Sequence, residues 1–239
     1  MKPQYRRVLL KISGEALAGP RGFGIDAAVA DTLAGEIKEV HGRCVQIGIV
    51  LGGGNIFRGL AGAAAGVDRT TGDTVGMLAT IINSLLFKES LKRAGVPARV
   101  LSALQMDKAL EFLTAQRAVA SLQAGEVVIM AGGTGNPYFT TDTAAALRCA
   151  ETNCDVLLKA TKVDGIYDDD PATNPAAKKI DTLTHEEALA RNIRVMDASA
   201  FSLCMDNGIP IVVFQMTHPG NLRRCIDGEP VGSTVRKGA

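Results

Sequence analysis

The chain has 239 residues, of which 46% are hydrophobic and 21% are charged, and its formal net charge is +1. This balance argues against bulk electrostatic binding to nucleic acid or to an anionic membrane, and the low aromatic content of 4% leaves few stacking surfaces for single strands. No run approaches the ~18 apolar residues of a membrane span, and the apolar stretch near the N-terminus is too short for a signal peptide, so a cytoplasmic protein is expected.

In the first half of the chain, short β-rich runs alternate with longer helical patterns. We expect strands over residues 6–12, 44–51 and 99–103. Asp26 and Asp73 can each N-cap a helix, and apolar residues recur at helical spacing after Asp73. The predicted order is therefore strand, helix, strand, helix, strand.

The second half of the chain continues this alternation. Strands that alternate with helices pair in parallel and carry helices on both faces. We therefore predict an α/β fold, a three-layer αβα sandwich around a mainly parallel sheet, formed by residues 1–239 as a single domain. The expected helices are 107–123, one from 142, 185–191 and 197–207, the expected strands are 126–131, 155–160 and 210–215, and the least ordered segments are 60–71 and 168–179.

The five cysteines are Cys44, Cys149, Cys154, Cys204 and Cys225, and no two of them have C-x-x-C spacing. An odd number of cysteines without that spacing favours reduced, mostly buried thiols over disulfides or a zinc site. This expectation agrees with a cytoplasmic location.

Glycine-rich segments follow four of the expected strands, at residues 11–14, 52–55, 132–135 and 159–165. The carboxyl ends of parallel strands form the edge of a sheet at which ligands of α/β proteins bind. Glycine lets backbone N–H groups approach a phosphate closely, although any one such run can also be an ordinary turn. The P-loop pattern G-x-x-x-x-G-K-[ST] is absent from the sequence. If these loops bind a phosphate, cations from separate loops would have to supply the positive charge that balances it.

Four cations stand in or near these segments: Lys11, Arg58, Lys159 and Lys162. Lys11 interrupts the apolar run VLLKISG, and a buried lysine is unfavourable unless it meets an anion. An edge lysine that extends to solvent is the alternative. Arg58 can present a guanidinium fork to a phosphate. We therefore expect these cations, from separate loops, to bind phosphate together, whereas a P-loop binds phosphate with one segment.

Aspartates stand at three expected helix starts, Asp73, Asp142 and Asp197. N-capping is a sufficient explanation for each of them, because a carboxylate accepts hydrogen bonds from the first free N–H groups of a helix. The carboxylate of Asp73 can also accept two hydroxyl groups of a ribose. The three histidines lie in polar settings, and we assign none of them a catalytic role.

Five motifs occur in order along the chain: KISGEAL at 11–17, GGGNIFRG at 52–59, GDTVGMLAT at 72–80, GTGNPYFTTD at 133–142 and KATKVDGIYDDDP at 159–171. Together they resemble the bacterial uridylate kinases of the amino-acid-kinase superfamily over nearly the whole chain. The resemblance implies the amino-acid-kinase fold and phosphoryl transfer from ATP to UMP in pyrimidine nucleotide biosynthesis. It also implies Mg²⁺ held mainly by nucleotide phosphates and water, with no metal ligand assigned to the protein.

The resemblance also assigns the ATP site and the catalytic groups. It implies that Lys11 neutralises charge on the transferred group, that Arg58 contacts phosphates of both substrates, and that Asp142 or Asp197 orients Lys11 or the metal-bound waters. The implied ATP-binding residues are Lys11, Ile12, Ser13, Gly14, Gly54, Arg58, Thr161, Tyr167 and Asp170, and the implied catalytic residues are Lys11, Arg58, Asp142 and Asp197.

The implied UMP-binding residues are Gly53, Asp73, Thr134, Gly135, Asn136, Pro137, Tyr138, Phe139, Thr140 and Thr141. Kinases of the same superfamily that act on aspartate, glutamate, carbamate or N-acetylglutamate would need a different acceptor pocket. A non-catalytic nucleotide-binding assembly on this fold is an alternative from another class. A dinucleotide-binding dehydrogenase lacks support, because no G-x-G-x-x-G pattern follows the first expected strand.

The segment 19–24, with the sequence GPRGFG, is too rich in glycine for a helix and too polar for a core strand. A flexible surface loop is the expectation from these residues. The resemblance gives the loop another meaning, at the centre of a homohexamer where GTP binds and activates, and it also implies inhibition by the end product UTP. The implied effector residues are Gly19, Pro20, Arg21, Gly22, Phe23 and Gly24.

Overall fold

The strands form one large sheet and one small sheet. The computed structural model describes residues 3–58, 66–171, 173–193 and 195–238. The strands are β1 (Arg7–Ile12), β2 (Gln46–Leu51), β3 (Ala98–Ser102), β4 (Glu111–Phe112), β5 (Val127–Ala131), β6 (Val156–Thr161), β7 (Ile166–Tyr167), β8 (Lys179–Ile180), β9 (Thr182–Thr184), β10 (Ile211–Gln215) and β11 (Ser233–Arg236). The large sheet has the order β4-β3-β5-β2-β1-β6-β10-β11-β9, and β7 pairs with β8. Within the large sheet, β10 and β11 run antiparallel and the other neighbours run parallel.

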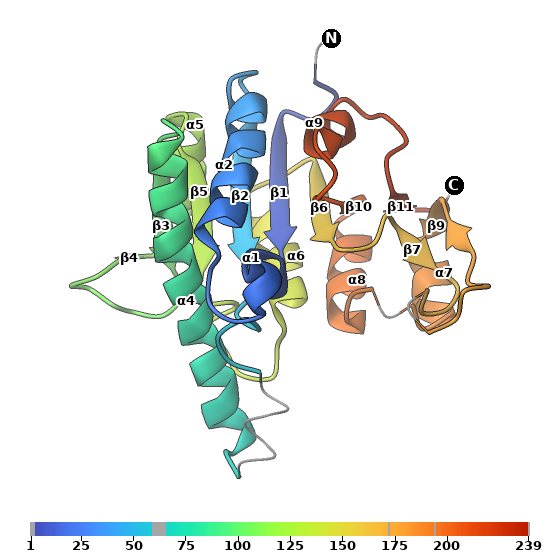
Figure 1. The fold of residues 1–239 in the computed structure, drawn as a ribbon, viewed down its shortest axis with the longest axis horizontal. Helices are drawn as coiled ribbons and strands as arrows, with labels where there is room; N and C mark the ends of the chain where they lie inside the picture. The colour runs from blue at the N-terminus through green and yellow to red at the C-terminus, as the bar shows by residue number, and fades with distance from the viewer. Residues whose placement is uncertain (1–2, 59–65, 172, 194, 239) are drawn as a thin grey trace.

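Helices cover both faces of the large sheet (Figure 1). The helical segments are α1 (Gly14–Leu17), the 3₁₀ turn η1 (Gly19–Arg21), α2 (Ala27–His41), α4 (Arg69–Arg93), α5 (Ala115–Gln123), α6 (Thr141–Glu151), α7 (His185–Ala190), α8 (Ala198–Asp206) and α9 (Asn221–Ile226). Apolar residues of α2, α4 and α9 form one core with Val8 and Leu10 of β1. Those of α5, α6, α7 and α8 form a second core on the other face, with Leu9. The predicted three-layer αβα arrangement is confirmed.

Two further sequence-based expectations are confirmed. All five cysteines are free thiols, and only Cys44 is exposed. Asp26 and Asp197 cap helices as expected: the carboxylate of Asp26 accepts the N–H groups of Ala28 and Val29, and that of Asp197 accepts the N–H of Ala200. In the described part of the chain, no helix has the length and apolar character needed to cross a membrane.

The other two predicted caps are wrong. The helix α4 begins before Asp73, and its N-cap is Asp68, which accepts the N–H of Thr71. The first turn of α4 is polar, so it lacks the apolar spacing that reveals a helix. Similarly, the N-cap of α6 is Thr140, whose hydroxyl accepts the N–H of Asp142. The carboxylates of Asp73 and Asp142 are therefore available for other partners.

Several element boundaries also differ from the prediction. The expected helix over 107–123 is wrong in its first half, because β4 pairs in parallel with β3 there and α5 begins only after its cap Thr114. In the segment 19–24, expected to contain no helix, residues Gly19–Arg21 form the turn η1. Of the segment 60–71, residues 60–65 lie outside the described residues and 69–71 belong to α4. Strands as short as β7, β8 and β9 are not detectable by periodicity, and the helix α9 was not predicted.

Candidate active site

The glycine-containing loops after β5, β2, β1 and β6 lie along one edge of the sheet. These four strands are consecutive neighbours in the sheet and run parallel, so their carboxyl ends share that edge, toward which β1 and β2 point in Figure 1. We call this the carboxyl edge. The loops supply backbone groups and side chains from four separate parts of the chain, as the sequence predicts.

Two buried lysines meet one buried carboxylate at the carboxyl edge. Lys11 of β1 and Lys159 of β6 are register partners on adjacent strands. Their side chains extend to the face covered by α6, where Asp142 lies in the first turn. The Nζ of Lys11 lies 2.8 Å from Oδ1 of Asp142, and the Nζ of Lys159 lies 2.6 Å from Oδ2. Each lysine side chain is only 9% exposed.

The charges in this cluster shift the pKa values of Asp142 and Lys159. Burial tends to raise the pKa of Asp142, but the ammonium groups of Lys11 and Lys159 outweigh it and lower that pKa. Burial lowers the pKa of Lys159 to about 8, although Asp142 opposes this change; the like charge of Lys11 adds to it. With both lysines protonated, these three residues carry one excess positive charge, which the nearby carboxylate of Asp197 offsets only from a greater distance, as the least of the influences on the pKa of Lys159. A buried excess charge is unfavourable, so this cluster is suited to receive an anion.

The loops after β1 and β2 touch each other. A Cβ atom on Gly14 would lie 2.3 Å from Oδ1 of Asn55 and 2.9 Å from the carbonyl oxygen of Gly52. A Cβ atom on Gly52 would lie 2.7 Å from the backbone nitrogen of Gly14. Glycine is therefore required at both positions by the close approach of the two loops. Ser13, between Lys11 and Gly14, caps α1 by accepting the N–H of Ala16.

A second group of charges, on the loops after β1, β2 and β6, is exposed. The Nη2 of Arg58 lies 2.8 Å from Oε1 of Glu15, and the Nζ of Lys162 lies 3.6 Å from Oε2. The Nε of Arg58 donates to the carbonyl of Gly54, and its side chain is 62% exposed. Glu15 thus lies between two cations whose side chains are 62% and 65% exposed.

A cavity of about 300 Å³ lies beside the cluster, between α4 and the loops after β2 and β5; Gly53, Asp73, Phe139, Thr140 and Thr141 contribute to its lining. Oδ2 of Asp73 accepts the N–H of Tyr138 at 2.8 Å and the Nε–H of Arg69 at 2.8 Å. Burial opposes the charge of Asp73, but these two bonds lower its pKa overall. The Arg69 guanidinium also lies 5.5 Å from the centre of the Tyr138 ring.

Asp197 links α8 to the start of α6. One of its oxygens accepts the hydroxyl of Thr143 at 2.8 Å, and the other accepts the hydroxyl of Thr140. Asp197 is therefore hydrogen-bonded to Thr140 and Thr143 at the start of α6, whereas Asp142 makes the direct contacts with the lysines. The predicted role of Asp197 as an orienting group would act through α6.

The remaining predicted residues lie on the surrounding loops. Thr134 forms a turn by accepting the N–H of Asn136, and Gly135 donates to the carbonyl of Gly132. At the end of β6, the hydroxyl of Thr161 donates to the carbonyl of Val163. The hydroxyl of Tyr167 donates to Asp164, which raises the pKa of that hydroxyl. The carbonyl of Asp170 accepts the N–H groups of Thr173 and Asn174 in a turn. In the 19–24 segment, the N–H of Gly24 donates to the carbonyl of Asn55.

Some residues that support the site were not predicted from the sequence. Lys159 was identified as a nearby cation without a catalytic role, although Lys159, like Lys11, interrupts an apolar strand. Buried polar residues that hold the glycine loops were also missed. Thr80 accepts the N–H of Gly132, Asn83 donates to the carbonyl of Gly52, and Arg148 donates to the carbonyl of Gly133.

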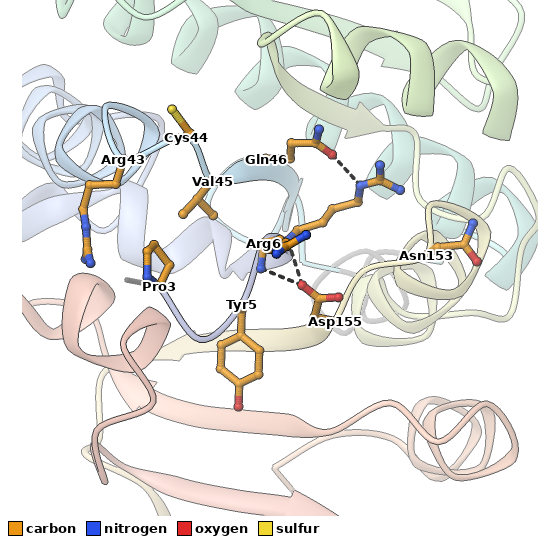
Figure 2. Close-up of a pocket in the computed structure, with 10 residues that line it drawn as sticks. Pro3, Tyr5, Arg6, Arg43, Cys44, Val45, Gln46, Asn153 and Asp155 are labelled. Carbon is orange, nitrogen blue, oxygen red and sulfur yellow. Dashed lines mark hydrogen bonds between the residues drawn. The ribbon is translucent and has the colours of Figure 1, made fainter. Parts of the chain in front are cut away.

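A larger cavity, of about 620 Å³, lies at the amino ends of β1, β2 and β6 (Figure 2). Figure 2 shows Asp155 turned toward the backbone of the chain before β1, where its Oδ2 accepts the N–H groups of Arg6 at 2.6 Å and Arg7 at 2.9 Å. The Nε of Arg7 donates to Gln46 at 2.7 Å. These polar groups pair with one another, so volume alone does not make this cavity the functional site.

The chain is similar to a known family and to several solved structures. The amino acid kinase family matches residues 6–215. The UMP kinase from Bacillus anthracis matches with a TM-score of 0.95 and 38% identity, over 98% of this chain and 97% of that chain. The UMP kinase from Ureaplasma parvum gives 0.91 and 37%, over 98% and 100%. The uridylate kinase from Archaeoglobus fulgidus gives 0.75 and 26%, over 95% and 99%. The predicted resemblance is confirmed, and the chain belongs to the amino acid kinase family.

Proposed function

We propose that this chain transfers the γ-phosphoryl group of ATP to UMP, giving ADP and UDP in pyrimidine nucleotide biosynthesis. The observation that carries the proposal is the buried Lys11–Asp142–Lys159 cluster beside the cavity that contains Asp73. Similarity to UMP kinases over nearly the whole length supports UMP as the acceptor. We propose that residues 1–239 act as one domain, since one sheet contains both β1 and β11. We also propose that the activity is cytoplasmic, a location in which five unpaired thiols stay reduced.

The chemistry requires positioning and positive charge more than covalent help. In phosphoryl transfer, catalysis comes from in-line alignment and from cations that stabilise charge on the equatorial oxygens. Lys11 and Lys159 would contact these oxygens while Asp142 keeps the two ammonium groups side by side. Arg58 would exchange Glu15 for a phosphate. The UMP phosphate is the nucleophile and is already ionised near pH 7, so no general base is needed.

Asp73 would select the acceptor through its ribose. Its Oδ2 takes the bonds from Tyr138 and Arg69, and Oδ1 has no hydrogen-bond partner among the described residues. An ionised carboxylate is acceptor-only, so Oδ1 would accept a ribose hydroxyl. The 134–141 segment, which begins after β5 and ends at α6, would surround the uracil and its phosphate.

Mg²⁺ would be bound mainly through the nucleotide. Within the described ranges, no three His, Cys, Asp or Glu side chains are grouped to hold a metal ion, and both oxygens of Asp142 contact lysines. Mg²⁺ often keeps several waters and takes substrate phosphates as ligands, which fits this donor set. When bound, the ion would neutralise charge on the phosphates, and the lysines would hold the oxygens that the ion leaves free.

An acceptor screen tests the proposed function. ADP release from ATP would be measured with UMP, aspartate, glutamate, carbamate and N-acetylglutamate as acceptors, and we expect turnover with UMP. Turnover with one of the other acceptors instead would assign the chain to a different activity of the same family. Binding of ATP and UMP without turnover would support the non-catalytic alternative.

We also propose that the protein is a homohexamer. On α4, Leu78, Ile82, Leu85 and Leu86 form an apolar stripe at helical spacing and are 39%, 46%, 40% and 51% exposed. Such a stripe on a helix surface is typical of a contact with another chain. Light scattering that gave a monomer would contradict this proposal.

We propose that GTP activates the enzyme through residues 19–24 and that UTP inhibits it. Phe23 is 68% exposed in this segment, and Arg21 could pair with a GTP phosphate at a contact between subunits. The rate would be measured at subsaturating UMP with GTP or UTP added. An unchanged rate would remove the regulatory proposal and leave the catalytic one intact.

A further inference from the structure

Two buried asparagines join the loop after β2 to the middle of α4. Asn55 follows Gly54 and is 1% exposed, and Asn83 is fully buried within α4. Nδ2 of Asn55 donates to Oδ1 of Asn83 at 3.0 Å, and Nδ2 of Asn83 donates to Oδ1 of Asn55 at 2.7 Å. The two amides therefore form a reciprocal pair.

Each amide uses its second N–H group to hold a backbone carbonyl. Nδ2 of Asn83 donates to the carbonyl of Gly52 at 2.7 Å, and Nδ2 of Asn55 donates to the carbonyl of Gly24 at 2.6 Å. The N–H of Gly24 in turn donates to the backbone carbonyl of Asn55 at 2.9 Å. The pair thus connects α4, the loop after β2 and the end of the 19–24 segment.

The pair also lies against the loop after β1. A Cβ atom on Gly14 would approach Oδ1 of Asn55 to 2.3 Å, so no side chain fits between them. Three residues before Asn83, the Thr80 hydroxyl accepts the N–H of Gly132 at 2.9 Å. Side chains of α4 therefore hold the loops after both β2 and β5. These loops are where the proposed reaction places ATP phosphates and UMP.

Buried amides are unfavourable unless every polar group is paired, and a paired network fixes direction as well as distance. An apolar pair would fill the same space without holding the Gly52 carbonyl or the Gly24 carbonyl. We propose that Asn83 and Asn55 are positioning residues for the proposed phosphoryl transfer, and that they couple Gly24 to the phosphate loop. This inference rests on the proposed function.

The first test compares Asn83→Ala with Ser84→Ala. Ser84 is a buried neighbour on α4 whose hydroxyl donates, among the described residues, only to the carbonyl of Thr80 within the same helix, so it is a matched control. We expect Asn83→Ala to lower kcat by about 10- to 100-fold, the scale of a small misplacement of reacting groups. Ser84→Ala should leave kcat unchanged, although it also removes a buried hydrogen bond.

A structural role and a positioning role predict different exchange rates. Amide hydrogen exchange at Gly24, read by NMR, should accelerate in Asn83→Ala and stay unchanged in Ser84→Ala, because Gly24 reaches α4 through Asn55. A folded Asn83→Ala enzyme with a lower melting temperature, normal kcat and normal exchange at Gly24 would overturn the proposal.

The wild-type protein provides a second test if Asn83→Ala does not fold. UMP with a non-hydrolysable ATP analogue should slow exchange at Gly24. Unchanged exchange at Gly24, with both nucleotides bound by calorimetry, would overturn the positioning proposal alone. Failure of calorimetry to detect either nucleotide would overturn the proposed function, and the positioning role with it.

Discussion

The two edges of the sheet carry similar charged residues in opposite arrangements. At the carboxyl edge, Lys11 and Lys159 share the single carboxylate of Asp142 and leave an excess positive charge. At the amino edge, Asp155 accepts backbone N–H groups of Arg6 and Arg7. The amino edge has the larger cavity, about 620 Å³ against about 300 Å³. The amino-edge cavity is also lined by more cations than carboxylates, but its Arg6 is exposed, whereas Lys11 and Lys159 are buried. Burial of the excess charge, more than volume, therefore distinguishes the candidate active site.

The direction of the chain explains this difference. In a parallel sheet with crossover helices, strands end and helices begin at the carboxyl edge. The helix α6 begins there at Thr141, directly beside the two lysines. Its dipole adds positive potential on the same side. Helices end at the amino edge, where this contribution is absent.

The largest expected effect comes from removing the unbalanced charge. Lys11→Ala should lower turnover by at least about 100-fold, the scale of losing one preorganised electrostatic group. Arg6→Ala is the matched control, because it removes a cation from the amino edge. Turnover would be measured with saturating ATP and UMP, and circular dichroism would verify folding. Near-normal turnover of a folded Lys11→Ala protein would show that the charge at the carboxyl edge matters no more than the charge at the amino edge.

A smaller effect is expected at the acceptor cavity. Asp73→Asn weakens the acceptor for the ribose, so it should raise the KM of UMP about tenfold and change the KM of ATP little; an unpaired buried polar group costs about 1–3 kcal/mol. Deoxy-UMP should be a poor acceptor for the same reason. Equal effects on the two KM values would remove Asp73 from the acceptor site.

The sequence predicted the general architecture because that architecture depends on local patterns. Apolar runs and helical spacing indicated the main strands and helices, and Lys11 was identified because it interrupts an apolar strand. Elements of two or three residues, such as β4, β7 and β9, carry too few residues for any period to appear. Their formation depends on neighbours that are distant in the sequence.

The contacts of the site were harder to predict, because they depend on partners far along the chain. Asp142 resembled a cap, and the actual cap Thr140 is only two residues away. The contact of Asp142 with both lysines depends on the register of β1 with β6, which no local pattern contains. Asn55 and Asn83 are likewise ordinary residues for a turn and a helix until the fold brings them together.

The pH dependence of the reaction tests whether the positive charge of Lys159 contributes to activity at the carboxyl edge. Burial lowers the pKa of Lys159 to about 8, so kcat/KM for ATP should fall above about pH 8 as the free enzyme loses a cation. Lys159→Arg keeps its charge and should remove this decline, which a pH series of initial rates would reveal. A decline that persists in Lys159→Arg would assign the titration to another group.

The same shift affects stability. The unfolded chain holds the Lys159 proton up to its ordinary pKa of 10.5, whereas the folded chain releases it near pH 8. Between these two values the unfolded chain binds more protons, so the contribution of Lys159 to stability rises with pH across that window. Denaturant titrations of the wild type and of Lys159→Met should differ in slope against pH there.

The smallest effect is expected at the amino edge, and it should affect stability alone. Asp155→Ala removes the acceptor of the Arg6 and Arg7 N–H groups, which water can partly replace because Asp155 is exposed. The loss should be about 0.5–1 kcal/mol, which lowers Tm by about 1–4 °C in a chain of this size. Unlike the lysines of the carboxyl edge, Asp155 is neither buried nor placed to meet a substrate, so kcat and both KM values should stay at wild-type levels. A fall in kcat that accompanied a normal Tm would show that the amino edge communicates with the site, and the two edges would no longer be separable.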